Sequence, residues 1–411
     1  MTDTSPPTPP VLDSTGTGLH AHVAKLRMPS ATPVTLPDGV HAWAVTDGVL
    51  AKKLLVDKRI TRDPIHWTRK RPTPQPGWLY AWTSASMFNA HGSDHTRLRR
   101  ILTTTFTKRR VESLRPGIET IVNDRLDALA DAAAADQVVD LRSVFSYPIP
   151  ITVICDLLGV PADQRAVMAQ VMEAAVNTSL PPDQAAANSQ VMAEAMAALA
   201  AHKRTHPGDD LTSDLIRVHD DTGDRLTETE LLATLLLLVG AGSETTVTLI
   251  NHATINTITN PTTREAVQTD PDRWGDVIEE TLRLNGPVMF LPLRYTTTDI
   301  TLPDGITIPA GEAVIIAFAA HGRDPLIHHD PDTFHIDRDD KNHLAFGHGI
   351  HHCLGATLAR LEAHIALTGL FNRFPDIALA VELEQFQPVP SFISTDYTNI
   401  PITAGTDRET T

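Results

Sequence analysis

Apolar residues recur at helical spacing over much of the chain. Between residues 111 and 220, alanine-rich amphipathic segments are broken at Pro161, Pro181, Pro182 and Pro207, and such breaks end helices. Residues 231–239 are apolar on every side, which predicts a helix buried in the core. The helices predicted before this one cover residues 111–134, 146–157, 161–178, 184–205 and 209–219.

A few short segments instead alternate with the period of a strand. Val40–Thr46 follows the turn at residues 37–39 and is predicted to be a hairpin strand, with a short helix over Ala51–Val56 behind it. The chain is predicted to be extended over Val288–Arg294, after Pro287. Further strands are predicted around residues 301–302, 306–308 and 313–319.

The stretch Asp63–Ala90 contains several prolines and little periodicity, so we predict a long loop, and loops of this length are often functional. It gathers five aromatic residues in a chain that is only 5% aromatic. These rings either line a pocket or pin the loop to the surface, and for Trp67 and Trp78 the second interpretation is at least as well supported. The five residues are Trp67, Trp78, Tyr80, Trp82 and Phe88.

Composition excludes several classes of function. The net charge of −16 argues against a nucleic-acid partner, because phosphate binding needs clustered cations. Only Cys155 and Cys353 occur, which excludes a disulfide framework and an iron-sulfur cluster with four cysteine ligands, and fits a reducing cytoplasm. Residues 1–10 lack the features of a signal peptide, and the apolar run 231–242 is too short to span a bilayer. We therefore expect a cytoplasmic protein without membrane contact.

The segment from Phe346 to Gly355 carries the most specific chemistry. Glycines on both sides of His348 predict a tight loop, and Cys353 stands just before a helical run over Ala356–Phe371. The start of a helix stabilises negative charge, and a thiolate is a metal ligand. Two alternatives stay open, namely a buried thiol and a zinc site, although no second Cys or His pair has zinc spacing. The candidate zinc ligands beside Cys353 are His343, His348, His351 and His352.

The pattern Phe-Gly-x-Gly-x-His-x-Cys-x-Gly resembles the haem-ligating loop of the cytochrome P450 monooxygenases, and all six fixed positions match. The resemblance extends from about residue 20 to about residue 402. It implies a mainly α fold with a small β portion, a triangular helical prism enclosing haem b. The expected organisation is a disordered tail over residues 1–16, one domain over 17–405 and a tail over 406–411. By the same resemblance Cys353 binds the iron, and the cofactor loop includes Phe346, Gly347, His351 and Gly355.

Four residues are expected to hold the haem propionates by this resemblance. His95 and Arg99 lie one turn apart on a predicted helix and match the family's His-x-x-x-Arg pattern. Without the rest of the chain, a solvated charged face would be the better interpretation of that pair. Arg294 and His351 complete the set, and an arginine at a strand edge remains the alternative for Arg294.

The buried helix continues into Ala241-Gly242-Ser243-Glu244-Thr245-Thr246, where a carboxylate and hydroxyls are costly unless they are hydrogen-bonded or reactive. The segment resembles the P450 motif that crosses the distal haem face with a local distortion. This implies that Gly242 gives space, that Thr245 donates a hydrogen bond to dioxygen, and that Glu244 relays protons. Side chains that merely bend the helix are the alternative, and it is credible for Ser243.

A weaker pattern places Glu280 and Arg283 three residues apart on a helix beginning near Asp272. It resembles the family's Glu-x-x-Arg pair, a structural network completed here by Arg338. The family's substrate pocket also maps onto this chain, with residues 168–180 as its roof. The expected pocket residues are Trp82, Phe88, Leu237, Ala241, Val288, Met289, Phe290, Leu291, Phe392 and Ile393.

The implied activity is insertion of one oxygen atom of dioxygen into a hydrophobic secondary metabolite, terpenoid or steroid. Gly-rich dinucleotide fingerprints are absent, so NAD(P)H is expected to act through a reductase and a ferredoxin. A basic cluster is the hypothesised ferredoxin dock, and a merely solvated surface is about as well supported. The alternatives are aryl coupling, peroxide use and a non-catalytic haem module, the last disfavoured by Glu244 and Thr245. The basic cluster comprises Arg100, Lys108, Arg109 and Arg110.

Overall fold

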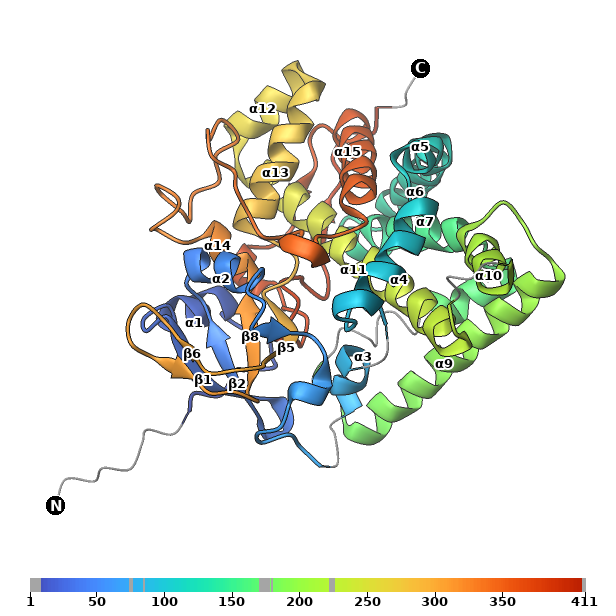
Figure 1. Cartoon of the computed structure of the whole chain (residues 1–411). Helices are drawn as coiled ribbons and strands as arrows, with labels where there is room; N and C mark the ends of the chain where they lie inside the picture. Colours follow the sequence, from blue (N-terminus) through green and yellow to red (C-terminus); the bar gives the residue numbers. More distant parts are fainter. Residues whose placement is uncertain are drawn as a thin grey trace.

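The computed structural model describes residues 9–73, 77–83, 86–169, 178, 180–221 and 226–408. Helices make up most of the fold, and the strands gather beside the N-terminal part of the chain (Figure 1). The helices are α1 (Leu19–Lys25), α2 (Gly48–Leu54), α3 (Tyr80–Thr83), α4 (Gly92–Thr105), α5 (Lys108–Ser113), α6 (Arg115–Ala135), α7 (Pro148–Leu158), α9 (Pro182–Thr205), α10 (Leu211–Asp221), α11 (Glu228–Thr259), α12 (Pro261–Thr269), α13 (Trp274–Leu284), α14 (Phe318–Gly322) and α15 (Ala356–Arg373).

The largest sheet joins segments that are far apart in sequence. It has the strand order β1-β2-β8-β5-β3, in which β2 and β8 run parallel and the other neighbours antiparallel. The strand predicted over residues 40–46 is confirmed as β2, whereas the one predicted over 313–319 ends at Ala317 because α14 begins there. The strands are β1 (Ala31–Leu36), β2 (Val40–Val45), β3 (Ile60–Thr61), β4 (Val139–Asp140), β5 (Phe290–Thr296), β6 (Ile300–Thr301), β7 (Thr307–Ile308), β8 (Ala313–Ala317), β9 (Ala378–Leu379) and β10 (Pro401–Thr403).

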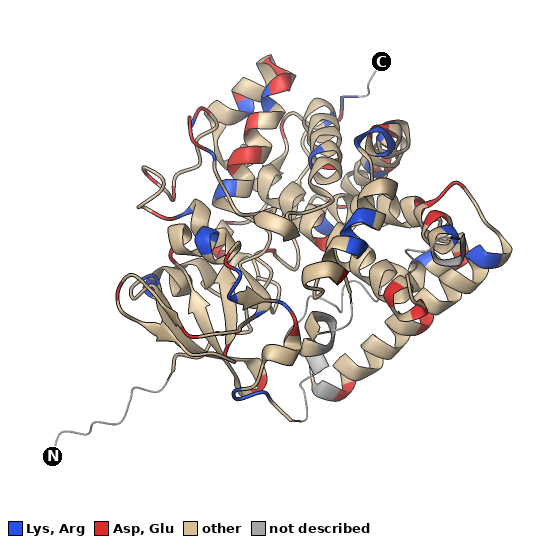
Figure 2. Cartoon of the chain, in the orientation of Figure 1, with Lys and Arg blue, Asp and Glu red and all other residues tan. Residues whose placement is uncertain are grey.

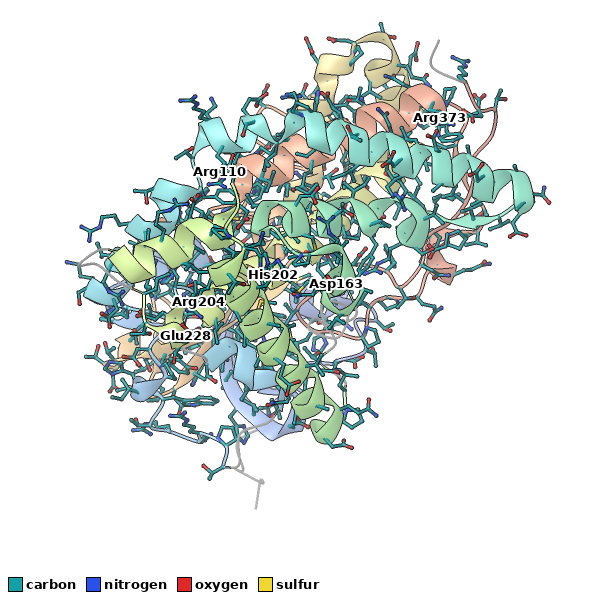
Figure 3. All side chains as sticks on the ribbon, turned by 90° about the vertical axis from the view of Figure 1, so that its right-hand side faces the viewer. Arg110, Asp163, His202, Arg204, Glu228 and Arg373 are labelled. Carbon is teal, nitrogen blue, oxygen red and sulfur yellow. The ribbon has the colours of Figure 1, made fainter. Side chains whose placement is uncertain are left out.

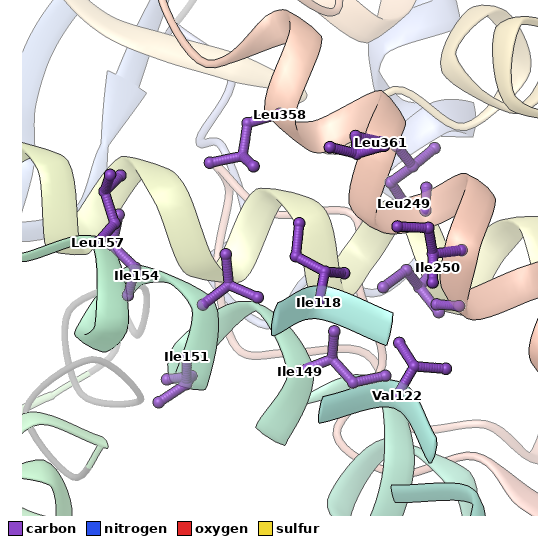
Figure 4. Packing of buried hydrophobic residues seen from close by; sticks show 14 of the residues in the cluster. Ile118, Val122, Ile149, Ile151, Ile154, Leu157, Leu249, Ile250, Leu358 and Leu361 are labelled. Carbon is purple, nitrogen blue, oxygen red and sulfur yellow. The ribbon is translucent and has the colours of Figure 1, made fainter. Parts of the chain in front are cut away.

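Helix α11 is the centre of the helical core, as its apolar sequence predicts. It packs against α7, α13 and α15, and Figure 4 shows Ile154, Leu249 and Leu361 among the side chains that interdigitate there. Its most apolar 18-residue window has a mean hydropathy of 1.5, so by length and composition alone the helix qualifies to cross a membrane. In this fold 56% of that window is buried inside the protein, which is the position of a core helix.

The start of α11 is fixed by its own residues and by α9. The Thr227 hydroxyl accepts a hydrogen bond from the Glu230 N–H at 3.2 Å, and the Glu230 carboxylate accepts one from the Thr227 N–H at 2.7 Å. This capping box satisfies two amides that the helix itself leaves unpaired. Arg204, near the end of α9, forms an ion pair with Glu228 at 2.5 Å, and the two lie close together in Figure 3.

The structure differs from the predicted N-terminal tail. Leu12 is 1% exposed, its N–H donates to the Thr35 carbonyl at 2.8 Å, and the Thr35 N–H donates to the Pro10 carbonyl at 2.9 Å. Residues 10–12 therefore lie along β1 and bury an apolar side chain there. Residues 1–8 and 409–411 lie outside the described chain.

Candidate functional site

The loop from Phe346 to Gly355 is as tight as the sequence predicts. Gly347 and Gly349 have φ of +71° and +73°, a region that disfavours side chains. The Cys353 N–H donates to the Phe346 carbonyl at 2.8 Å and closes the loop. A Cβ on Gly349 would lie 2.8 Å from Val56 Cγ1, so the loop also packs closely against the end of α2.

Cys353 stands three residues before α15, whose N-cap is Gly355. The cysteine is accessible, yet enough protein surrounds it that burial raises the pKa of its thiol. Backbone N–H groups of Gly355 and Ala356 donate to the sulfur and, with the positive charges of Arg99 and Arg360, oppose this rise in pKa. These donors and positive charges would stabilise the anionic sulfur once a metal ion binds it. Cys155 is instead buried in α7, where burial raises its thiol pKa to about 11.

The zinc alternative finds no ligand set in the described chain. No group of three or more His, Cys, Asp or Glu side chains there is arranged to hold a metal. His343 lies 3.2 Å from the Glu279 carboxylate, and the ring of His351 lies 4.3 Å from that of His95 between centroids. The candidate ligands beside Cys353 are thus turned toward different partners.

His95, His351 and Arg294 form a donor cluster beside the Cys353 loop, in which only the arginine carries a positive charge. His95 and Arg294 are 3% and 4% exposed. Among the described residues, His95 Nε2 and Arg294 Nη1 have no hydrogen-bond partner. Burial, together with the charges of Arg62, His95, Arg294 and Arg99, lowers the pKa of His351 to about 2, and burial lowers that of Arg294 to about 10. The cluster is therefore short of negative charge and suits an anionic ligand.

Helix α11 presents one accessible stripe in its middle. Leu237, Ala241 and Thr245 follow at intervals of four residues and are partly or fully exposed, whereas Ser243, Glu244 and Thr246 are buried. The Thr245 hydroxyl donates to the Ala241 carbonyl at 2.8 Å. The helix is continuous from Glu228 to Thr259, so the local distortion expected around residue 242 is not present.

Gly242 lies where α11 meets α7. A Cβ added there would lie 3.1 Å from Ile154 Cδ1 on α7. The glycine thus allows the two helices to approach closely. It is three residues from Thr245, which is about 60° around the helix, so the expectation that Gly242 gives space for dioxygen stays a prediction.

Glu244 belongs to a buried ionic network that the sequence analysis did not identify. Arg142, in the π-helical turn Arg142–Ser146, donates to the Glu244 carboxylate at 3.1 Å and to the Asp396 carboxylate at 3.3 Å. Asn251 donates to both Asp396 oxygens, at 2.9 and 3.1 Å. The network joins three segments that are distant in sequence, and a single arginine in a short apolar stretch gives little signal of it.

Comparison of the sequence with known proteins shows the family of this chain. The cytochrome P450 family model matches residues 58–181 and 275–390. The chain is 41% identical over 397 residues to the 2-hydroxy-5-methyl-1-naphthoate 7-hydroxylase of Streptomyces carzinostaticus, covering 95% of this chain and 96% of that protein. The chain belongs to the cytochrome P450 family.

Further P450s support the same assignment. The vitamin D(3) 25-hydroxylase of Pseudonocardia autotrophica is 38% identical, over 93% of this chain and 94% of that one. The structure of CYP154A1 from Streptomyces coelicolor A3(2) superposes with a TM-score of 0.91 at 43% identity, covering 96% of this chain and all of that chain. The fold is therefore that of the P450s, and the protein is an oxygen-incorporating oxidoreductase with a haem cofactor.

The donor cluster fits the two carboxylates of a P450 haem. His95, Arg294 and His351 are brought together as expected, with Arg99 half-buried near Cys353. Unpaired buried donors are costly, and carboxylates would pair with them. Phe346 supports the loop, since the Arg360 guanidinium lies 4.4 Å from its ring centroid and the ring packs against the helical core.

Glu280, Arg283 and Arg338 also come together as expected. Glu280 and Arg283 are fully buried and form two hydrogen bonds, of 2.7 and 2.8 Å. Glu280 further accepts from Arg338 at 3.2 Å and from the His335 N–H at 2.9 Å, and Arg283 donates to the Pro331 carbonyl at 2.7 Å. The network ties α13 to the loop that leads to Cys353.

The neighbouring Glu279 predicts a pH dependence of stability. Burial raises its pKa, but hydrogen bonds and charges from His343 and Arg360 outweigh this and lower the pKa from 4.5 to about 2. A carboxyl group whose pKa is lower in the folded state stabilises the fold above its unfolded pKa, and this contribution is lost as the pH falls from about 4.5 to about 2. In Glu279→Gln the denaturation midpoint should therefore depend less steeply on pH between about 4.5 and about 2. The variant Glu265→Gln, on the exposed face of α12, should keep the wild-type slope, and equal slopes in both variants would contradict the assignment.

The expected substrate pocket is only partly accessible. Trp82, Phe88, Val288 and Leu291 are partly exposed. Met289, Phe290, Phe392 and Ile393 are buried in the core cluster beside the large sheet, so for these four the expectation of lining the pocket is replaced by a packing role. The Met289 N–H donates to the Ile393 carbonyl at 2.7 Å, which holds the two segments together. Most of the expected roof, residues 170–177 and 179, lies outside the described chain.

Aromatic pairs hold the loop over residues 63–90 in place. Trp67 is 2% exposed and stacks on Tyr295 with ring centroids 5.5 Å apart, so it pins the loop. Trp78 meets Phe392 edge-on at 5.4 Å, and Trp82 meets Phe88 edge-on at 5.5 Å. The pinning interpretation therefore holds for Trp67, while the Trp82–Phe88 pair remains partly accessible.

The basic cluster is less positive than its sequence suggests. Figure 2 shows the arginines of α4 in blue, with acidic residues on the neighbouring elements. Arg110 pairs with Asp214 on α10 and lies 3.9 Å from Asp209. Arg109 and Arg110 line a surface cleft of about 850 Å³ together with these acids. Part of the cluster is therefore neutralised within the chain.

Proposed function

We propose that this P450 binds haem b through the Cys353 thiolate and inserts one oxygen atom of dioxygen into a hydrophobic small molecule. The observation that carries the proposal is the Cys353 loop, where an accessible sulfur receives two backbone N–H donors at the start of α15. A thiolate-bound haem supplies cleavage of the O–O bond and oxidation of C–H bonds. Haem of the b type fits because Cys353 and Cys155 are the only cysteines, and Cys155 is buried in α7.

In this proposal Thr245 and Glu244 deliver protons. The Thr245 hydroxyl donates a hydrogen bond to the Ala241 carbonyl. This bond orients the hydroxyl oxygen on the accessible stripe of α11. Glu244 is one residue away, and Arg142 holds its carboxylate by a hydrogen bond. Rotation of either side chain would connect the stripe to the buried network.

The variant Thr245→Val tests this role. It keeps the shape of the side chain and removes the hydroxyl, so we expect the rate of product formation to fall by about 100-fold while NADPH consumption continues and hydrogen peroxide accumulates. Thr248→Val is the matched control, because the Thr248 hydroxyl donates to the Glu244 carbonyl at the same 2.8 Å but is buried. Equal loss of product in both variants would show that helix packing, and not proton delivery, is affected.

The substrate class follows from the accessible side chains. Trp82, Phe88, Val288 and Leu291 offer aromatic and aliphatic surface, which favours a flat or polycyclic apolar molecule. The naphthoate and vitamin D(3) hydroxylases are P450s of similar sequence whose names indicate such substrates. We therefore infer a secondary metabolite or steroid-like substrate for hydroxylation.

Electrons are proposed to come from NAD(P)H through a reductase and a ferredoxin in the cytoplasm. Arg100, Lys108 and Arg109 remain the candidate contacts for an acidic ferredoxin, with Arg110 engaged by Asp214. We propose that the catalytic unit is a single domain over residues 17–405. Residues 10–12 also pack on it, because the Thr35 N–H donates to the Pro10 carbonyl.

The test is an oxygen-labelling experiment on the purified full-length protein. Reduced protein exposed to carbon monoxide should show the strongly red-shifted Soret band of a thiolate-bound haem. With a surrogate ferredoxin, its reductase and NADPH, a panel of naphthoates and steroids under ¹⁸O₂ should yield a hydroxylated product with one labelled oxygen. Label arriving only from water, or turnover only with added peroxide, would contradict the proposal.

A further inference from the structure

Arg62 is a buried cation that forms no ion pair with any described residue. It follows β3 directly and is 1% exposed. Its Nη1 donates to the Pro292 carbonyl at 3.4 Å, while Nε and Nη2 have no hydrogen-bond partner among the described residues. A buried, ionised guanidinium with two unpaired nitrogen donors is strongly unfavourable. We therefore expect an anion to bind beside it.

The strand register places this arginine beside another one. In the antiparallel pair of β3 and β5, Ile60 faces Thr296 and Thr61 faces Tyr295, so continuing the register by one residue brings Arg62 opposite Arg294. Like charges at facing positions repel. Burial lowers the pKa of Arg62 well below its usual range, and the charge of Arg294 adds to this effect. The Arg62 charge also contributes to the lowered pKa values of His351 and His95.

We propose that Arg62 is a further propionate-binding residue of this P450, an inference that rests on the haem binding proposed above. Arg62 and Arg294 would share an anion, because Nε and Nη2 of the first and Nη1 of the second are the donors without partners among the described residues. A guanidinium presents two parallel N–H groups that match a carboxylate. An anion bound between the two guanidinium groups would offset the repulsion between them, because both are attracted to it.

The contact with Phe88 holds the guanidinium in place for this role. Arg62 Cζ lies 3.6 Å from the Phe88 ring centroid, and Phe88 in turn meets Trp82 edge-on. Stacking on the ring fixes one face of the guanidinium and leaves its edge free for hydrogen bonds. Arg62 thereby connects the propionate site to an accessible part of the pocket wall.

Haem transfer from the holoprotein to excess apomyoglobin tests the proposal. For Arg62→Gln we expect the rate of haem loss to rise by roughly 10- to 100-fold, with Arg62→Lys between this variant and the wild type. The matched control is Arg59→Gln, in the same segment, because the Arg59 side chain is 49% exposed and pairs with Asp57 at 2.7 Å. That variant should lose haem at the wild-type rate.

Reconstitution of the full-length chain with haem dimethyl ester separates propionate binding from a structural role. Esterification removes both carboxylate charges, so the difference in affinity between wild type and Arg62→Gln should disappear. A difference that persists with the ester would overturn the proposal, and Arg62→Lys allows the same comparison if the glutamine variant does not fold. A wild type that binds no haem would instead refute the proposed function. A wild type that binds haem while Arg62→Gln behaves like Arg59→Gln would refute only the role of Arg62.

Discussion

Cys353→Ala should abolish the red-shifted carbonyl Soret band of the reduced protein. The sulfur of Cys353 is the only accessible thiol of the chain, and two backbone N–H groups at the start of α15 point to it. A thiol that coordinates a metal is fully deprotonated, and no other side chain of the loop can supply an anionic sulfur. The measurement is the difference spectrum of dithionite-reduced protein with and without carbon monoxide, combined with the haem content per chain.

Two further variants show what the loss means. Cys155→Ala removes a thiol that is 1% exposed in α7, and it should leave the spectrum unchanged. Cys353→His offers a neutral nitrogen ligand, and we expect it to retain haem with the carbonyl band at the position typical of histidine-bound haem. A red-shifted band that survives in Cys353→Ala would rule out this sulfur as the ligand.

Glu280→Ala should lower the apparent free energy of unfolding by about 3–5 kcal/mol, because it leaves the charges of Arg283 and Arg338 without their shared carboxylate. Arg283 is fully buried, and Glu280 accepts hydrogen bonds from both arginines and from the His335 N–H. The measurement is the guanidinium midpoint of the holoprotein, followed by helix circular dichroism and by the Soret band.

The control for this variant lies on the same helix. Arg273, just before α13, and Asp276 have the same three-residue spacing and a distance of 2.7 Å, but their side chains are 29% and 40% exposed. Asp276 also pairs with the partly exposed Lys341 at 3.0 Å. Asp276→Ala should therefore cost no more than about 1 kcal/mol, as is usual for exposed pairs. Similar losses in the two variants would mean that the spacing, and not burial, determines the energy.

The sequence is informative where a feature depends on neighbouring residues. The apolar run at residues 231–239 predicts the buried helix α11, and the two glycines around His348 predict a loop with positive φ at both. The spacing of Glu280 and Arg283 places them on one helical face, and the family pattern adds Arg338. Each of these depends on local periodicity or on backbone freedom, which a single chain displays directly.

Features that depend on packing between distant segments are not visible in this way. The parallel pairing of β2 with β8 joins residues 43–45 to residues 314–316, and no local pattern specifies that partner. Arg62 is one of three basic residues at positions 58–62, and Arg142 is a single basic residue in a largely apolar stretch, so neighbouring residues single out neither. Their contacts arise only when β5, α11 and the C-terminal segment are placed beside them. For Gly242 the motif predicts the residue, and the structure adds its close contact with Ile154 on α7.

The Arg142 network has a consequence for changing the substrate range. Asp396 accepts from Arg142 and Asn251, and it lies only three residues after Ile393, at the end of the segment beside the pocket. A library that varies residues 391–393 alters a buried segment whose far end is tied through Asp396 and Arg142 to Glu244 of α11. Substitutions that shift Asp396 are then expected to lower coupling efficiency even when the new substrate binds well. Val288 is bridged to Ser394 in the same segment, so a library at Leu291 is the better place to begin.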